Sequence, residues 1–90
     1  YTLIVFIEFD PAKDAANHAK HGVSLAVAER FDWEHEPVQP AKAVGGEVRW
    51  KILAMVDTDL FAAIFTMRGA VARIISVRHA RRTERRHYEQ

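Results

Sequence analysis

The 90-residue sequence contains no cysteine, and glycine (four) and proline (three) are scarce. The absence of cysteine excludes a disulfide framework and a thiolate zinc site, and it favours a reducing compartment. No apolar run approaches the ~20 residues that a membrane helix needs. The sequence also lacks the basic region and the small-residue cleavage site that flank the apolar stretch of a signal peptide. We therefore expect a cytoplasmic protein that does not bind a membrane.

The amino-acid composition is typical of one soluble globular domain. Apolar residues make up 49% of the chain and charged residues 28%, which excludes a disordered chain, a collagen-like repeat and a bare coiled coil. A chain of this length suits a single domain over residues 1–90, built around one hydrophobic core.

Positive charge is concentrated at the C-terminal end. The net charge of +1 hides a balance of −4 over residues 1–67, with six Lys/Arg and ten Asp/Glu, and of +5 over residues 68–90, with seven Arg and two Glu. Such asymmetry within a chain is typical of a surface that meets nucleic acid.

Capping residues and apolar alternation predict the order of the elements. Asp10-Pro11 begins a helix and Gly22 ends it in a left-handed conformation, while Ser24 caps a second, shorter helix. The sequence predicts a strand over 2–9, helices over 11–21 and 25–31, a loop over 32–46 with an edge strand around Val38, strands over 47–56, 60–67 and 71–78, and a helix over 80–89. This order indicates an α+β fold: a small, mostly antiparallel sheet, with two N-terminal helices and a C-terminal helix packed mainly on one side. The first strand joins the sheet at an edge or in the centre.

Two pairs of residues are the first candidates for a phosphate site. Arg73 and Arg78 lie in the last predicted strand, on opposite faces because five residues separate them. Either one face is solvated or an arginine holds a phosphate. Lys20 and His21 suit the negative end of the helix dipole, but a histidine can also transfer protons near neutral pH. His18 and His21 lack the acidic partner of a zinc-protease motif, so we expect neither a metal nor a cofactor.

The predicted C-terminal helix has unbalanced charge. Five arginines fall within residues 78–86 against a single glutamate, so an acidic body or an acidic partner has to offset their repulsion. Ala80, Glu84 and Tyr88 follow at four-residue intervals and share one face of the helix. Glu84 and Tyr88 are therefore either structural groups or part of a site beside Arg73 and Lys20.

Three motifs in order resemble those of the BrnT toxins, the ribonuclease components of type II toxin–antitoxin systems. The likeness spans about residues 7–89, although Phe9 stands where many members have Trp and residues 33–44 follow no family pattern. The matching segments are Asp10-Pro-Ala-Lys13 with Asn17 and Lys20-His21-Gly22-Val23-Ser24, then Gly46-Glu47-Val48-Arg49-Trp50, and finally Arg73-Ile-Ile-Ser-Val-Arg78 with Ala80, Glu84 and Tyr88.

The resemblance implies a RelE-like α+β fold and RNA cleavage without a metal ion, which inhibits translation. It also implies a BrnA-type antitoxin, which joins a toxin-binding segment to a ribbon-helix-helix DNA-binding part. Such complexes usually contain two copies of each chain and bind operator DNA only through the antitoxin. The alternatives are a non-catalytic basic module that binds nucleic acid or an antitoxin, and a degenerate toxin that keeps only the antitoxin interface.

The implied reaction is attack of the RNA 2′-hydroxyl on the adjacent phosphorus. Arg73 and Arg78 would hold the phosphate with help from Lys20, because fixed cations stabilise the charge that develops on the phosphate oxygens. His21 or Glu84 would act as base or acid, and Tyr88 would position the substrate or donate a proton. Further RNA contacts are expected from Arg49, Arg81, Arg82 and Arg85.

Overall fold

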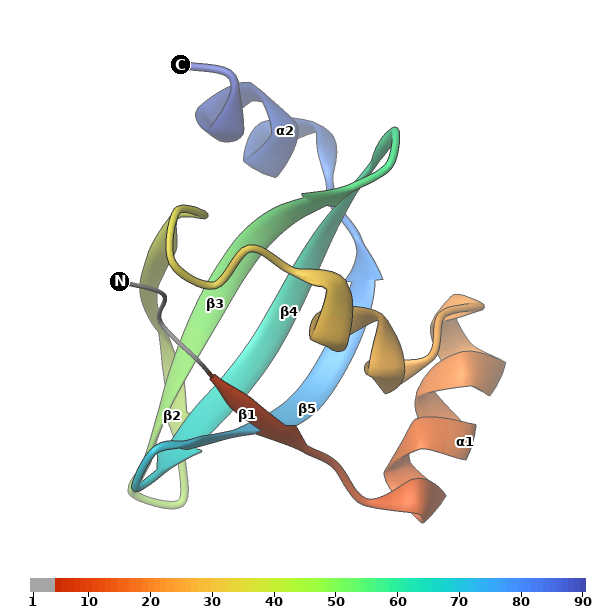
Figure 1. The fold of residues 1–90 in the computed structure, drawn as a ribbon, viewed down its shortest axis with the longest axis vertical. Coiled ribbons are helices and arrows are strands. Elements are labelled where there is room, and N and C mark those ends of the chain that lie inside the picture. The colour runs from red at the N-terminus through yellow and green to blue at the C-terminus, as the bar shows by residue number, and fades with distance from the viewer. Residues whose placement is uncertain (1–4) are drawn as a thin grey trace.

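A five-stranded sheet forms the centre of the computed structural model, which describes residues 5–90 (Figure 1). The elements are β1 (Phe6–Glu8), α1 (Pro11–His21), the 3-10 helix η1 (Leu25–Arg30), β2 (Val38–Val44), β3 (Glu47–Val56), β4 (Asp59–Arg68), β5 (Val71–His79) and α2 (Arg82–Tyr88). The strand order is β1-β5-β4-β3-β2, and all pairings are antiparallel except that of β1 with β5. The predicted α+β fold is confirmed, and the first strand lies at an edge. Residues 2–4 of that predicted strand lie outside the described residues.

The predicted caps fix the two N-terminal helical segments. The Asp10 side chain accepts a hydrogen bond from the Ala12 N–H at 2.8 Å, and Gly22 ends α1 with φ of 72°. Ser24 accepts from the Ala26 N–H at 3.1 Å and begins η1. The second segment is a 3-10 helix, a form that short helical segments often adopt.

Residues 32–46 contain more regular structure than their composition suggests. The edge strand expected around Val38 is confirmed and is seven residues long, reaching Val44 with an irregularity between Ala41 and Val44. Pro40 is accommodated because, within the described part of the chain, β2 pairs with β3 alone, and an edge strand tolerates a missing N–H.

The sheet has two different faces. We call the face with Ile52, Ala54, Phe65 and Ile74 the inner face; η1 covers it and forms the main core. The outer face has a smaller apolar cluster of Leu53, Leu60 and Ala62, against which Ala80 and Tyr88 pack. In Figure 1, α1 lies beside β5 and α2 lies at the far end of the sheet.

The position of α2 differs from the prediction in two respects. The helix packs at one end of the outer face, so the expectation that the helices lie mainly on one side is wrong for α2. It also begins at Arg82 instead of Ala80, because Arg81 has an extended backbone with φ of −79° and ψ of 165°. The Arg81 N–H is held by the Glu84 carboxylate at 2.8 Å.

A bulge in β5 changes which side chains share a face. Ile64 pairs with Ser76, but Phe65 pairs with Ile74, so Ile75 is an extra residue in β5. Side chains alternate along a strand, and an extra residue reverses that alternation. Arg73, Ser76 and Arg78 therefore all lie on the outer face. The prediction that Arg73 and Arg78 lie on opposite faces is wrong, because it assumed an uninterrupted strand.

Asn17 joins α1 to the edge of β5. Its side-chain nitrogen donates to the carbonyl oxygens of Val23 and Val77, both at 2.8 Å, and its oxygen accepts from the Val77 N–H at 3.2 Å. The residue is only 7% exposed. The amide thus takes the place of a neighbouring strand beyond the short β1.

We expect Asn17→Ala to lower the free energy of unfolding by about 2 kcal/mol, because it leaves buried backbone groups without partners. Urea unfolding measures the change. His18→Ala, on the exposed side of the same helix, is the control and should change stability little. An Asn17→Ala protein as stable as the control would show that the Val77 backbone finds other partners.

Candidate functional site

Four basic side chains share the outer face of the sheet. Arg49 and Lys51 come from β3 and Arg73 and Arg78 from β5, and each side chain is between 20% and 28% exposed. Strand alternation and the bulge at Ile75 put them on one side. Among the helices of residues 5–90, only α2 lies on this face, and it covers one end. We call these four residues the basic face.

Glu84 binds two of these cations at the α2 end. Its carboxylate accepts from both terminal nitrogens of Arg78 at 2.6 and 2.9 Å and from the Lys51 Nζ at 2.7 Å. The Glu84 side chain is only 8% exposed. The hydrogen bond from Arg78 has the largest effect on the pKa of Glu84 and, with the Arg81 N–H and Lys51, holds it far below its usual range.

Glu84 is therefore a structural anion, and its predicted role as acid or base is not supported by the geometry. Both terminal nitrogens of Arg78 donate to Glu84. Arg78 therefore anchors α2, and its guanidinium group is not free to bind a phosphate. Sequence reasoning missed Lys51 as the second cation. Its position between the apolar residues Trp50 and Ile52 of a central strand was the available signal.

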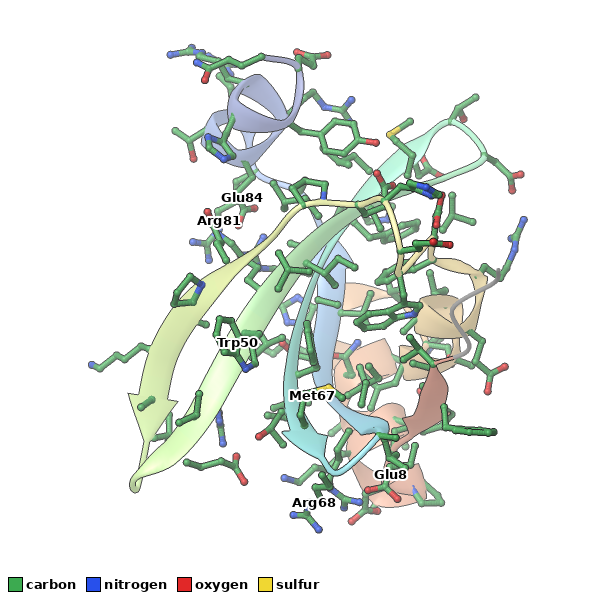
Figure 2. The ribbon with its side chains drawn as sticks, turned by 60° about the vertical axis from the view of Figure 1, so that its left-hand side comes forward. Glu8, Trp50, Met67, Arg68, Arg81 and Glu84 are labelled. Atoms are coloured by element: carbon green, nitrogen blue, oxygen red, sulfur yellow. The ribbon has the colours of Figure 1, made fainter. Side chains whose placement is uncertain are left out.

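The other two cations have weaker partners. The Arg73 Nη1 lies 3.3 Å from Glu8 Oε1, and the Arg49 Nε lies 3.1 Å from Glu47 Oε1. Both carboxylates are substantially exposed, and such pairs contribute only about 0 to 1 kcal/mol. An incoming phosphate can replace them at small cost. Figure 2 shows Glu8 and Glu84 at opposite ends of the sheet. Arg73, which pairs with Glu8, is therefore well separated from Arg78, which pairs with Glu84.

Lys20 and His21 lie apart from the Glu84 cluster. They line a hollow of about 240 Å³ between α1 and β5. Ser76, which faces outward between Arg73 and Arg78, lines the same hollow. The structure thus brings Lys20 and His21 to the β5 edge of the outer face, but it does not bring them to Glu84 or Tyr88.

Tyr88 is held by Glu36, in the loop before β2. Its hydroxyl donates to Glu36 Oε1 at 2.9 Å, and Glu36 Oε2 accepts from the Met55 N–H at 2.7 Å. Burial and the neighbouring Glu36 carboxylate raise the pKa of the Tyr88 hydroxyl. Tyr88 therefore ties α2 to the loop before β2 and is poorly placed to donate a proton. Sequence reasoning missed Glu36, because it placed this residue in a loop and assigned no contact to it.

The remaining predicted contacts lie at the rim of the basic face. Arg81 directly precedes α2, Arg82 and Arg85 lie on it, and all three are exposed and form no ion pair with residues 5–90. Within those residues, no group of three His, Asp or Glu side chains is arranged to hold a metal ion. No described helix is long and apolar enough to span a membrane.

The fold and this surface define a class of small α+β domain with a cationic sheet face. The profile of a family described as the ribonuclease toxin BrnT of type II toxin–antitoxin systems matches residues 9–84. The chain belongs to the BrnT family of ribonuclease toxins. Membership implies endoribonuclease activity and an antitoxin partner.

A solved structure supports the same assignment. The Brucella abortus ribonuclease toxin BrnT superimposes with a TM-score of 0.70 and 29% sequence identity, over 88% of this chain and 100% of that chain. No match was found among curated protein sequences.

Proposed function

We propose that the protein cuts RNA without a metal ion, and that RNA lies across the basic face. One observation carries the proposal: the bulge at Ile75 turns Arg73 to the same open face as Arg49 and Arg78. Within residues 5–90, the ion-pair partners of Arg73 and Arg49 are exposed carboxylates, which phosphate oxygens can replace. Arginine is suited to this exchange because its planar fork matches the geometry of a phosphate.

The reaction is an internal transesterification. A base removes the proton of a 2′-hydroxyl, the 2′-oxygen bonds to the adjacent phosphorus, and the bond from phosphorus to the 5′-oxygen breaks. The leaving 5′-oxygen takes up a proton, so the products are a 2′,3′-cyclic phosphate and a 5′-hydroxyl. Arg73 and Arg49 stabilise the negative charge on the non-bridging oxygens, which is usually the largest catalytic contribution.

His21 is the residue that we assign to proton transfer. Glu84 is fully engaged by Arg78 and Lys51, and Tyr88 is engaged by Glu36, which leaves His21 among the predicted acid–base groups. It lines the hollow that reaches Ser76 on the outer face, and Lys20 supplies a cation beside it. General acid–base catalysis contributes about 10²- to 10⁴-fold.

The family assignment supports further proposals on the biological setting. The protein is a RelE-like toxin that acts in the cytoplasm and inhibits translation by cutting RNA. A BrnA-type antitoxin with a ribbon-helix-helix part neutralises it in a complex of two copies of each chain. Operator DNA is bound only through that antitoxin.

Cleavage of a labelled RNA should proceed at the same rate in excess EDTA as with added magnesium. The products should carry a cyclic phosphate, which mass spectrometry identifies. Loss of activity in EDTA with recovery on adding a divalent ion would overturn the metal-free mechanism. Binding that weakens steeply with salt but leaves RNA length unchanged would favour the non-catalytic module.

A further inference from the structure

A groove between α2 and the strands β2 and β3 has no role in the function proposed so far. It consists of two adjoining hollows, of about 90 and 230 Å³, which share Gln39, Leu53 and His87. Pro37 lines the smaller hollow and Thr83 the larger one. Gln39 pairs in register with Lys51, so the groove opens directly beside the basic face.

The lining of the groove suits a flat heterocycle. Leu53 is buried and provides an apolar floor, and His87 is exposed on α2 and provides a planar ring. Unpaired RNA bases stack on aromatic side chains, histidine included, and their edges are then read by hydrogen bonds. Gln39 and Thr83 supply such groups: an amide can both donate and accept, and a hydroxyl can do the same.

The neighbouring charges favour a nucleotide over a purely apolar occupant. Lys51 and Glu84 line the larger hollow, and Arg78 is bound to the same carboxylate. The triad of two cations and one anion carries a net positive charge. Arg82, which precedes Thr83 in the first turn of α2, adds another exposed cation to this helix. A base in the groove would therefore have its phosphate beside positive charge.

We propose that this groove binds one unpaired base of the RNA and gives the enzyme its base preference. The inference rests on the proposed function, because it requires RNA on the outer face. His87 stacks on the base, Gln39 and Thr83 read its edge, and Lys51 attracts the phosphate. Gln39 and His87 are thus specificity residues that leave the bond-breaking chemistry to the β5 edge.

The test uses short homopolymers of A, C, G and U with 2′-O-methyl groups, which lack the attacking hydroxyl and cannot be cut. Wild-type affinities, measured by fluorescence anisotropy, should favour one homopolymer by about tenfold or more. His87→Ala should weaken binding of the preferred homopolymer by about 5- to 150-fold, the usual effect of losing one stacking contact. Gln39→Ala should reduce the preference and retain most of the affinity.

His18→Ala is the matched control, because it removes an exposed histidine from a helix outside the groove and should leave all four affinities unchanged. Circular dichroism confirms that each variant is folded.

A parallel assay on cleavable RNA separates this inference from the proposed function. Cleavage by wild type, with equal affinities that His87→Ala does not change, would overturn the base site alone. A base preference lost in His87→Ala, without cleavage by wild type, would support the base site and overturn the ribonuclease function. Failure to bind any homopolymer would overturn the base site, and failure to cut the cleavable RNA as well would overturn both.

Discussion

Arg73→Ala is expected to lower the rate of RNA cleavage in EDTA by about 10²- to 10³-fold, the usual loss when one positioned donor to a developing anion is removed. The bulge at Ile75 puts Arg73 on the outer face, and among residues 5–90 its ion-pair partner is Glu8, at 3.3 Å. The substitution should leave the fold intact, because that ion pair is partly exposed and contributes little to stability. Single-turnover rates on a labelled RNA measure the loss.

Two variants make this result specific. Arg30→Ala removes another arginine from an ion pair, with Asp57 at 3.0 Å, and it lies away from the basic face, so cleavage should be unaffected. Arg73→Lys keeps the charge but not the planar fork, and an intermediate rate is expected. Full activity in a folded Arg73→Ala protein would exclude Arg73 as a phosphate ligand.

Glu84→Gln is expected to release α2 from the sheet. The carboxylate holds Arg78, Lys51 and the Arg81 N–H together, and removing one partner of a largely buried ion pair costs about 2 to 3 kcal/mol. A helix of seven residues does not persist on its own in water. Amide exchange in α2 should therefore rise sharply, while the five strands remain protected. Glu89→Gln, at the exposed end of the same helix, is the control.

The contribution of Glu84 should depend on pH in a defined direction. Its pKa in the folded protein lies far below its usual value of about 4.3. The stabilisation is therefore complete above that usual value and is lost as the pH falls toward the folded value. Urea unfolding should show a large stability difference between wild type and Glu84→Gln at pH 7, and a smaller one at pH 3. A difference that stays constant between these two pH values would contradict the ion-pair account.

Local signals in the sequence predicted most of the elements correctly. Asp10, Gly22 and Ser24 act within a few residues, so their caps could be predicted without knowledge of the fold. The alternation around Trp50 and Ile52 likewise identified β3. The extent of β2 was not predictable in this way, because an edge strand that contains Pro40 depends on pairing with β3 more than on its own composition.

The candidate site was harder to predict because it depends on pairing between distant segments. Nothing in residues 73–78 indicates that Ile75 is an extra residue, since the bulge is defined only by the register with β4. The sequence singled out Arg73 and Arg78 within an otherwise apolar strand, and Glu84 on one face of the last helix. It could not show that Glu84 is paired with Lys51, which is 33 positions away.

Asn17 also determines which edge of the sheet can accept a further strand. The described residues of β1 pair with residues 71–73 of β5. The C-terminal part of β5 would otherwise present free backbone groups to a strand from another molecule. The Asn17 amide occupies both hydrogen-bonding groups of Val77, and α1 lies over the same edge. The toxin is thereby protected from edge-to-edge aggregation on this side. An added strand would have to pair with β2 instead, where Pro40 has no N–H to offer.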